Sequence, residues 1–430
     1  MLFRSVVVLD RSGTDELAYR RVRGDADAVR RTLVRVERAP TASFRASELD
    51  GDPWLLATGE ERALLRTAAD GAARLGDVVE TIFTGLQTSA DRIYILEDRG
   101  RRGANRVVYS RASDRELELE PDLLRPLASG TDTDRYAFRP LRTSLLFPYR
   151  RGEDGRMALL TSGELARLPL TAGYLAEHEG ALRGREKGKM DHDRWYAYVY
   201  PKSLGAHDRP KLGVPRLCDR LEAAVDPEGK VYLDNVDVNG ILVAGDRPSV
   251  WTLGVLLNAR LLDFLFRRFS VPFRGAYFSA NKQFIAPLPI HLPPAYEAAR
   301  FDELGRRLHA AAGAVERERG GFLDWLSGVL GTPAGSLSGA TKIVAYDDLS
   351  LSELLAILQG NRRRLAVDSA SRAFRELLER EWSASLDRLR ALRADLLRDE
   401  VLADDLVFEL YGLTAAQRAL VDAEFTPPAP

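Results

Sequence analysis

The sequence predicts an α+β protein: an irregular β-rich module flanked by helices, with a C-terminal helical bundle. Between residues 77 and 245, short runs of β-branched and aromatic residues alternate with Gly, Pro, Asp and Asn, which is typical of short strands joined by turns. After His291-Leu-Pro-Pro294 the composition shifts to Ala, Leu, Arg and Glu at helical spacing. These changes predict three segments, namely residues 1–75, 76–295 and 296–426.

The first segment begins with the apolar run Met1–Asp10, which predicts a buried strand. Asp25–Arg38 predicts a short amphipathic helix, and a second helix is expected over about 60–74, after Trp54. A lone strand followed by helices cannot cover its own faces. We therefore expect residues 1–75 to be a linker or the trailing edge of a domain whose main body lies elsewhere.

The middle segment opens with Asp77–Leu96, where strand, polar turn and strand follow one another, and these residues alone favour a tight hairpin. Asp98–Asn105 predicts a charged loop, and Ser162–Arg183 predicts a helix. Further short strands are expected around Val107, Phe138, Leu145, Tyr196, Leu212, Val231 and Ile241. The apolar stretch Trp251–Phe269 contains four charged residues, so it predicts a core helix rather than a membrane span.

The last segment is predicted to be helical throughout because it has helical spacing, steady charge and few β-branched residues. Its expected helices cover Tyr296–Glu318, Phe322–Leu330, Leu351–Asn361, Ser371–Glu400 and Asp404–Glu424. Within Tyr411-Gly-Leu-Thr414, Gly412 is expected to end one helix and Thr414 to cap the next.

The composition is that of a globular protein, since 45% of the 430 residues are hydrophobic. A single cysteine, Cys218, excludes an internal disulfide and a thiolate-rich zinc site, and it fits a reducing compartment. The N-terminal apolar run is too short, and charged too early, for a signal peptide. We expect a cytoplasmic protein with no membrane partner.

Positive charge is concentrated in the middle of the chain, although the net charge is only −1. Residues 134–220 hold 17 Lys and Arg against 11 Asp and Glu, and residues 247–282 hold 6 against 1. The tail, residues 368–424, holds 8 against 13. Such a distribution is expected of a surface that meets phosphates, although solvated charged faces also produce it.

Three groups of residues have the chemistry for contacts with nucleic acid. Around Gly85, which would let the backbone approach a ligand, neutral hydrogen-bonding groups are offered by Thr84, Gln87 and Thr88. Contacts with phosphates are expected from Lys187, Lys189, Arg194, Lys202 and Lys211. Contacts with base edges are expected from Arg274, Asn281 and Lys282, which flank a turn in the most basic segment. For each charged residue alone, a solvated surface charge is the alternative interpretation.

Four motifs follow one another in an order that resembles the Taq I-like C-terminal specificity, or target-recognition, domain of adenine-specific DNA methyltransferases. They are Gly85-Leu-Gln-Thr-Ser-Ala-Asp-Arg-Ile-Tyr-Ile-Leu96, Leu123-Leu-Arg-Pro-Leu-Ala-Ser-Gly-Thr-Asp132, Arg194-Trp-Tyr196 with Pro210-Lys-Leu212, and Asn281-Lys-Gln-Phe-Ile-Ala-Pro-Leu-Pro-Ile290. Val407-Phe-Glu-Leu-Tyr-Gly-Leu-Thr414 extends the likeness to the C-terminal region of longer restriction-modification proteins. The resemblance implies that residues 76–295 recognise double-stranded DNA, and that residues 1–75 resemble the end of a Rossmann-like methyltransferase domain.

The resemblance also implies a catalytic half that binds S-adenosylmethionine and flips adenine into an Asn-Pro-Pro-Tyr pocket. The sequence lacks that motif, because Leu292-Pro-Pro-Ala has neither the polar residue nor the aromatic. It also lacks a strand followed by a donor-binding glycine turn, since Gly100–Gly103 lies in an Arg-rich loop and Gly320-Gly321 has no preceding strand. We expect no cofactor in this chain and a methyltransferase domain or subunit as its partner.

Other catalytic and metal sites are not predicted. Asp191-His-Asp193 has no second His at a ligand spacing, so a charged turn is the favoured interpretation. Glu120-Pro-Asp122 and Asp234-Asn-Val-Asp237 lack a following Glu-x-Lys, and no Gly-x-Ser-x-Gly turn is present.

The sequence therefore predicts sequence-specific DNA recognition for an adenine-specific, S-adenosylmethionine-dependent methyltransferase of a restriction-modification or phage-defence system. The resemblance implies membership of the site-specific DNA adenine methyltransferases, but this chain has neither the catalytic nor the donor-binding motif, so we expect it to be inactive alone. The alternative is a non-catalytic assembly subunit of a phage-defence complex, which would associate through its Ala/Leu/Arg helices.

Overall fold

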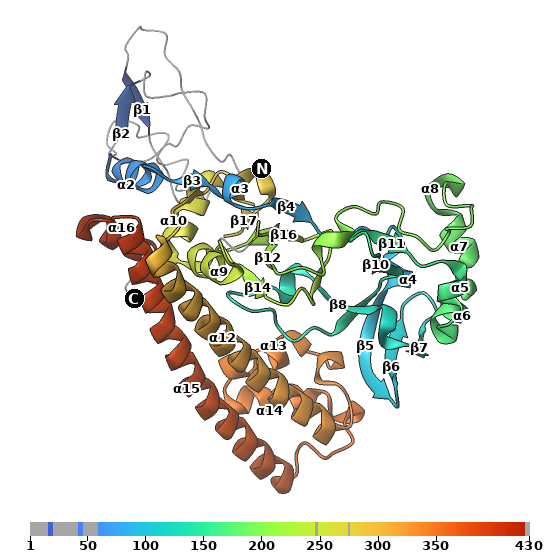
Figure 1. Ribbon diagram of the computed structural model, residues 1–430. Coiled ribbons are helices and arrows are strands. Elements are labelled where there is room, and N and C mark those ends of the chain that lie inside the picture. Colours follow the sequence, from blue (N-terminus) through green and yellow to red (C-terminus); the bar gives the residue numbers. More distant parts are fainter. Residues whose placement is uncertain (1–15, 20–41, 46–58, 246–247, 274–275, 426–430) are drawn as a thin grey trace.

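A computed structural model describes residues 16–19, 42–45, 59–245, 248–273 and 276–425, and it has the predicted α+β architecture (Figure 1). Near the N-terminus, β1 (Glu16–Tyr19) pairs antiparallel with β2 (Ala42–Arg45). The strand expected over 1–10, the helix over 25–38 and Trp54 lie outside the described residues. The next expected helix is confirmed as α2 (Gly59–Ala69).

The first core surrounds a four-stranded antiparallel sheet of order β14-β12-β16-β4. Its strands are β4 (Thr81–Thr84), β12 (Lys211–Pro215), β14 (Ala224–Asp226) and β16 (Val238–Leu242). The apolar stretch predicted as one core helix packs on this sheet as two, α9 (Val250–Asn258) and α10 (Arg260–Phe269). The chain turns at Ala259 because the buried Asn258 amide bonds to the backbone of Ala223, and Asp404 accepts the Arg260 N–H.

Two glycines that face each other across β12 and β16 make room for aromatic rings. A Cβ at Gly240 would lie 2.2 Å from the ring of Phe83, and one at Gly213 would lie 2.6 Å from the ring of Phe138. Phe138 was expected to centre a strand, but it makes a single bridge to Thr133 and its ring lies on the sheet.

The second core lies on a six-stranded sheet of order β15-β8-β9-β5-β6-β7. Its strands are β5 (Ile95–Arg102), β6 (Asn105–Ser110), β7 (Arg115–Leu119), β8 (Leu124–Ala128), β9 (Thr143–Leu146) and β15 (Tyr232–Leu233). The adjacent short helices are α4 (Asp91–Tyr94), α5 (Ser162–Leu165), α6 (Pro169–Glu177), α7 (Glu179–Arg183) and α8 (Arg185–Gly188). Figure 1 shows this part as a separate lobe to the right of the first sheet.

Buried tyrosines fill this second core. Tyr94, Tyr149 and Tyr198 pack edge to face at centroid distances of 5.1 and 5.2 Å. The hydroxyl groups of Tyr94 and Tyr196 donate to backbone carbonyls at 2.8 and 2.7 Å, so the buried oxygens are satisfied. Tyr196, expected in a strand, lies instead in an irregular segment that these bonds hold.

The hairpin predicted over residues 77–96 is wrong. β4 pairs with β16 of the first sheet, whereas β5 pairs with β6 and β9 of the second. The polar turn between them, with the short helix α4, is therefore a crossing between the two cores. The charged loop expected over 98–105 is largely the β5–β6 hairpin, which turns at Gly103.

Three further two-stranded pairs close the module. They are β10 (Tyr149–Arg151) with β11 (Met157–Leu159), β13 (Leu217–Cys218) with β17 (Phe278–Ser279), and β3 (Ala73–Arg74) with β18 (Pro289–Ile290). Along the chain, α11 (Lys282–Ile285) lies between β17 and β18, and α3 (Leu75–Val78) follows β3.

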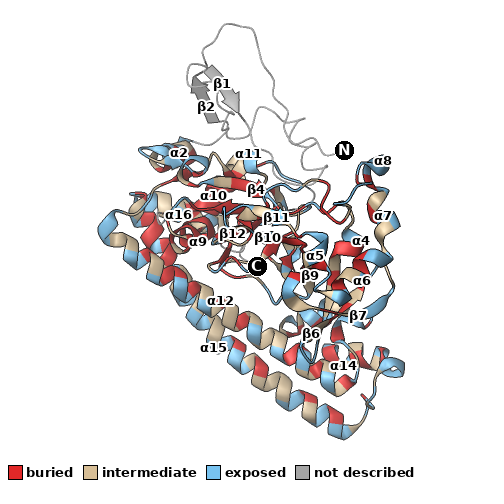
Figure 2. Ribbon diagram, turned by 45° about the vertical axis from the view of Figure 1, so that its right-hand side comes forward, coloured by how far each residue is buried: buried red, intermediate tan, exposed pale blue. Residues whose placement is uncertain are grey.

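The C-terminal helices form an arm that extends away from the sheets (Figures 1 and 2). Its helices are α12 (Ala295–Leu330), α13 (Ala340–Val344), α14 (Leu351–Gly360), α15 (Arg372–Leu410) and α16 (Ala415–Phe425). Two predicted helices, 296–318 and 322–330, are one continuous helix that includes Gly320 and Gly321. α12 and α15 run antiparallel, since Glu318 pairs with Arg388 at 2.8 Å, whereas Arg307, earlier on α12, pairs with Asp399, later on α15.

The corner predicted at Tyr411–Thr414 is confirmed. Gly412 has φ +64° and ends α15, and Thr414 begins α16 by exchanging hydrogen bonds with Gln417. The expected segment boundaries near 75 and 295 stay a prediction.

Candidate nucleic-acid interface

The turn after β4 brings two distant segments into contact. A Cβ at Gly85 would lie 2.3 Å from the backbone carbonyls of Leu233 and Asp234, so only glycine fits there. Leu86 donates its N–H to the Leu233 carbonyl at 2.8 Å. Gly85 was expected to let the backbone approach a ligand, but the close partner is the chain itself. Its neighbours Thr84 and Gln87 are exposed.

Thr88 has a structural role rather than the predicted contact with nucleic acid. It is fully buried, its hydroxyl donates to the Asp91 carboxylate, and the same oxygen accepts the Ala90 N–H at 3.0 Å. These bonds organise the start of α4, and the side chain is not accessible to a macromolecule.

Lys187 lies in a backbone conformation that L residues rarely adopt. Glu186, Lys187 and Gly188 all have positive φ, at 49°, 61° and 85°. A left-handed conformation costs each of the two non-glycine residues about 1 kcal/mol or more, and such strain persists only when the surroundings impose it.

Arg185 supplies part of that restraint. Its buried guanidinium donates to the carbonyls of Leu182, Thr88, Trp195 and Ala197 at 2.8, 3.1, 2.6 and 2.9 Å. The strained turn therefore begins at a fixed point and presents exposed side chains on its outer side, including Lys187 and Lys189.

A line of contacts connects this turn to the β4 turn. Lys189 Nζ lies 5.6 Å from the ring centroid of Tyr200, and Tyr200 forms an antiparallel bridge with Gln87. Lys202, two residues further, is exposed and donates its N–H to the Tyr200 carbonyl at 2.8 Å. Arg194 is exposed on the same connecting segment.

A second line of contacts leads from the β4 turn to the end of the module. Leu86 bridges to Asp234, and the carbonyl of Val236 accepts a hydrogen bond at 3.1 Å from Arg216. Arg216 also donates to the Asn281 Oδ1 at 2.8 Å. In Figures 1 and 2, β4 and α8 accordingly lie along one edge of the molecule, and Figure 2 places α11 there as well.

The predicted base-contacting residues have different surroundings. Asn281 is half-buried, and both ends of its amide are engaged, since Nδ2 donates to Ser279 Oγ at 2.9 Å. Lys282 is exposed as the first residue of α11. Arg274 lies outside the described residues. Sequence reasoning missed Arg216, which belongs to none of the quoted motifs.

The exposed cations of this edge have no carboxylate within 4 Å among the described residues, unlike most arginines of the fold. They are Lys187, Lys189, Arg194, Lys202 and Lys282. Unpaired, exposed cations on one face are what electrostatic contact with phosphates requires. Asp234 bridges to Leu86 in this region, and burial, together with the nearby charge of Asp237, raises its pKa.

Lys211 was predicted to contact a phosphate, but the structure places it in the core. Its side chain is fully buried and forms an ion pair with Asp226, its partner across β12 and β14. Nζ also donates to the His207 carbonyl at 2.6 Å. Burial lowers the pKa of the Lys211 ammonium, against the opposing effect of Asp226. This lysine belongs to the core of the fold.

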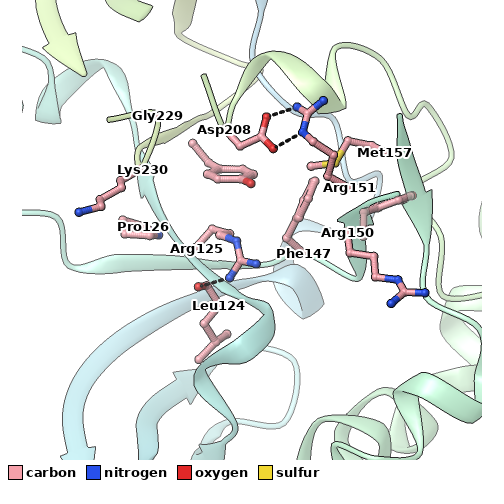
Figure 3. A pocket seen from close by; sticks show the side chains of 12 residues that line it. Leu124, Arg125, Pro126, Phe147, Arg150, Arg151, Met157, Asp208, Gly229 and Lys230 are labelled. Carbon is pink, nitrogen blue, oxygen red and sulfur yellow. Dashed lines mark hydrogen bonds and ion pairs between the residues drawn. The ribbon is translucent and has the colours of Figure 1, made fainter. Parts of the chain in front are cut away.

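A cavity of about 450 Å³ opens between the second sheet and the loop before β15 (Figure 3). Its aromatic wall includes Phe147 and Tyr232, and Arg151 makes an ion pair with Asp208 at its edge. Arg125 donates to the Asp122 carbonyl at 2.8 Å. The one carboxylate among the lining residues is thus already paired, and the lining offers no nucleophile with an adjacent base.

The motifs considered for metal or donor binding lie in a charged turn, a hairpin turn and a long helix. No group of three His, Cys, Asp or Glu side chains there is arranged to hold a metal ion. In the predicted charged turn, Asp191 pairs with Arg183 at 3.1 Å and His192 Nδ1 accepts the Arg194 N–H. Gly103 lies in a hairpin turn and Gly320 inside α12, so neither forms the strand-to-helix turn that S-adenosylmethionine would need.

None of the helices in the described ranges is long and apolar enough to cross a bilayer. The stretch from Trp251 to Phe269 lies instead in the first core, as predicted.

The sequence is similar over about half its length to two curated proteins. It is 22% identical over 234 residues to the Type II methyltransferase M.XhoI of Xanthomonas vasicola, a match that covers 54% of this chain and 38% of that protein. It is 22% identical over 239 residues to the Type II methyltransferase M.PaeR7I of Pseudomonas aeruginosa, covering 56% and 37%. No known protein-family profile matches the sequence. The matches span less than two fifths of these relatives, and they support a relationship of this chain with the methyltransferases of restriction-modification systems.

Proposed function

We propose that this chain recognises double-stranded DNA on behalf of an adenine-specific, S-adenosylmethionine-dependent methyltransferase of a restriction-modification or phage-defence system. The catalytic half, with the donor site and the Asn-Pro-Pro-Tyr pocket, is supplied by another domain or chain. The chain described here would hold the duplex so that the target adenine reaches that pocket.

The observation that carries this proposal is the group of five exposed, unpaired cations on one edge of the molecule: Lys187, Lys189, Arg194, Lys202 and Lys282. Four of them lie within residues 187–202, which the bridge of Gln87 to Tyr200 joins to the β4 turn. The bridge of Leu86 to Asp234 and the hydrogen bonds of Arg216 to Val236 and Asn281 connect that turn with the segment of Lys282. The strained backbone at Lys187 supports a functional role, because strain of this kind is concentrated at binding sites. The similarity to Type II methyltransferases supports DNA as the ligand.

Salt-dependent binding to duplex DNA tests the proposal. If the five cations each neutralise one phosphate, the logarithm of the binding constant falls with a slope of about −4.5 against the logarithm of salt concentration. Affinity should therefore drop about 500-fold between 50 and 200 mM salt. Replacing Lys187, Lys189, Lys202 and Lys282 by alanine should remove most of this slope.

Lys342→Ala is the matched control, since Lys342 is an exposed lysine on the helical arm with no ion pair among the described residues. It should leave the slope unchanged. An affinity that does not respond to salt, or that falls equally for the control, would refute DNA recognition by this edge.

An assembly subunit is the second candidate function. Leu397 and Val401, one turn apart on α15, are 60% and 46% exposed, and exposed apolar neighbours favour a protein partner. Apolar docking through this helix would change little with salt, so the same titration against a partner protein separates the two functions.

A further inference from the structure

Arg216 occupies a corner where the backbone is fixed on both sides. Its N–H donates to the Asp237 carbonyl at 2.6 Å, and its carbonyl accepts the Ala280 N–H at 2.9 Å. The residue joins β12 to β13, and β13 pairs with β17. The Cα of Arg216 is therefore held between the loop before β16 and the segment before α11.

The side chain of Arg216 is also held, and by neutral partners. Nε donates to Asn281 Oδ1 at 2.8 Å, and Nη1 donates to the Val236 carbonyl at 3.1 Å. A further contact from Nη1 to the Asn235 carbonyl is long, at 3.4 Å. Within the described part of the chain, Nη2 has no partner and no carboxylate lies within 4 Å of the guanidinium.

This arrangement leaves the outer edge of a planar, charged group free. A guanidinium has five N–H donors in a rigid fork, and here the two donors of Nη2 remain available. The side chain is half-exposed, and its neighbour Val236 is 66% exposed. Asn281, Val236 and Arg216 all belong to the edge that carries the unpaired lysines.

We infer that Arg216 contacts a guanine edge in the major groove, and that Asn281 is the positioning residue that fixes the plane of its guanidinium. The inference rests on the proposed recognition of duplex DNA. The two free donors of Nη2 can reach the O6 and N7 acceptors of one guanine. That contact depends on the orientation of the guanidinium plane. A residue that only contacts phosphate has no need of two fixed hydrogen bonds to neutral acceptors, because phosphate contact tolerates a mobile point charge.

The test starts from the full-length chain and a pool of duplexes with a randomised central segment. The sequence that the wild-type protein enriches is compared with its single base-pair variants in equilibrium binding at fixed salt. Arg216→Lys should keep the affinity for unrelated duplex within about twofold, because the charge remains. At one G·C pair it should reduce discrimination by about 5- to 140-fold, which is the ~1 to 3 kcal/mol of a bidentate pair at 1.4 kcal/mol per tenfold.

Two variants of Asn281 test its role as the positioning residue. Asn281→Ala should lower discrimination at the same G·C pair, whereas Asn281→Asp, which keeps an acceptor for Nε, should restore the discrimination ratio even if its added charge weakens binding overall. A merely structural role would not move with the acceptor in this way. Melting temperatures of all variants check that the proteins are folded.

The outcomes distinguish failure of the proposed function from failure of the role assigned to Arg216. If the wild-type chain enriches no sequence, the proposed function is refuted and the role of Arg216 with it. If enrichment occurs and Arg216→Lys retains full discrimination at every position, the proposed function stands and the role of Arg216 is refuted.

Discussion

Replacement of Lys211 by methionine should destabilise the protein without weakening the proposed binding of DNA. The side chain is fully buried, and Asp226 is 3% exposed, so the ion pair between them lies in the core. In the variant, Asp226 keeps two backbone donors, the N–H groups of Lys230 and Val231 at 3.0 and 2.9 Å, but it loses its counter-charge. The His207 carbonyl also loses its donor.

The expected loss of stability follows from the Asp226 charge, which remains buried in the variant. Removal of one partner of a buried pair costs about 3 to 5 kcal/mol, because the other charge stays buried and uncompensated. At an m-value of ~3 kcal/mol/M, the urea midpoint should fall by about 1 to 1.7 M. Asp226→Asn, which removes the charge instead, should cost less than Lys211→Met if Lys211 can lose its proton, as its lowered pKa favours.

The assay combines urea unfolding, followed by tryptophan fluorescence, with DNA binding measured well below the unfolding midpoint. Lys189→Ala provides the comparison, since that exposed lysine should weaken binding and leave stability within about 0.5 kcal/mol. An unchanged urea midpoint for Lys211→Met, together with a loss of DNA affinity as large as that of Lys189→Ala, would refute the assignment of Lys211 to the core.

Four further predictions follow from the same structure. Gly85→Ala places a Cβ 2.3 Å from the Leu233 carbonyl, so it should cost ~2 to 3 kcal/mol in urea unfolding and weaken DNA binding; full stability would contradict the close approach. Burial, then the charge of Asp134, raises the pKa of Glu222 to about 7, so the folded state holds a proton that the unfolded state has lost, and stability should fall as pH rises from about 4.5 to 7. Glu222→Gln should remove ~1 to 3 kcal/mol of that fall, after allowance for partial exposure, and an identical pH profile in urea unfolding would contradict it. The Cys218 thiol is buried and its pKa is raised, so a thiol reagent such as a maleimide should label it only on unfolding, and rapid labelling of the folded protein would show an accessible site. Calorimetric titration of the isolated chain with S-adenosylmethionine should give no heat of binding, whereas micromolar affinity would reveal a donor site.

The elements that the sequence predicted well are those whose signals are local. Apolar residues at helical spacing identified the helical arm, and the Gly412 and Thr414 corner followed from capping chemistry alone. The hairpin over residues 77–96 failed because strand pairing is not a local property. Both strands were recognised, but β4 pairs with the distant β16 of one sheet, whereas β5 pairs with β6 and β9 of the other.

The exposure of single residues in the candidate site also depends on contacts that are distant in the sequence. Lys189 and Lys211 are alike in sequence, yet one is exposed and the other has no accessible surface. All five residues of β12 are buried, so no alternation of polar and apolar residues marks Lys211 as internal. Its partner, Asp226, is brought opposite by the register of β12 and β14, which the sequence does not display. Arg216 was missed for a related reason, since its three hydrogen-bond acceptors come from residues 235, 236 and 281.

The pairing of β3 with β18 brings the two ends of the middle portion of the chain together. Arg74 lies opposite Pro289 across this short ladder, so the residues between them leave and re-enter the remainder of the chain at neighbouring points. An insert that replaced this portion would therefore have both of its ends at one short ladder. It would also have to keep its contacts with the helical arm, such as the ion pairs of Arg135 with Glu400 and of Arg260 with Asp404. At Gly305 of α12, a Cβ would lie 2.6 Å from the Trp251 carbonyl, so this close approach would have to be preserved as well.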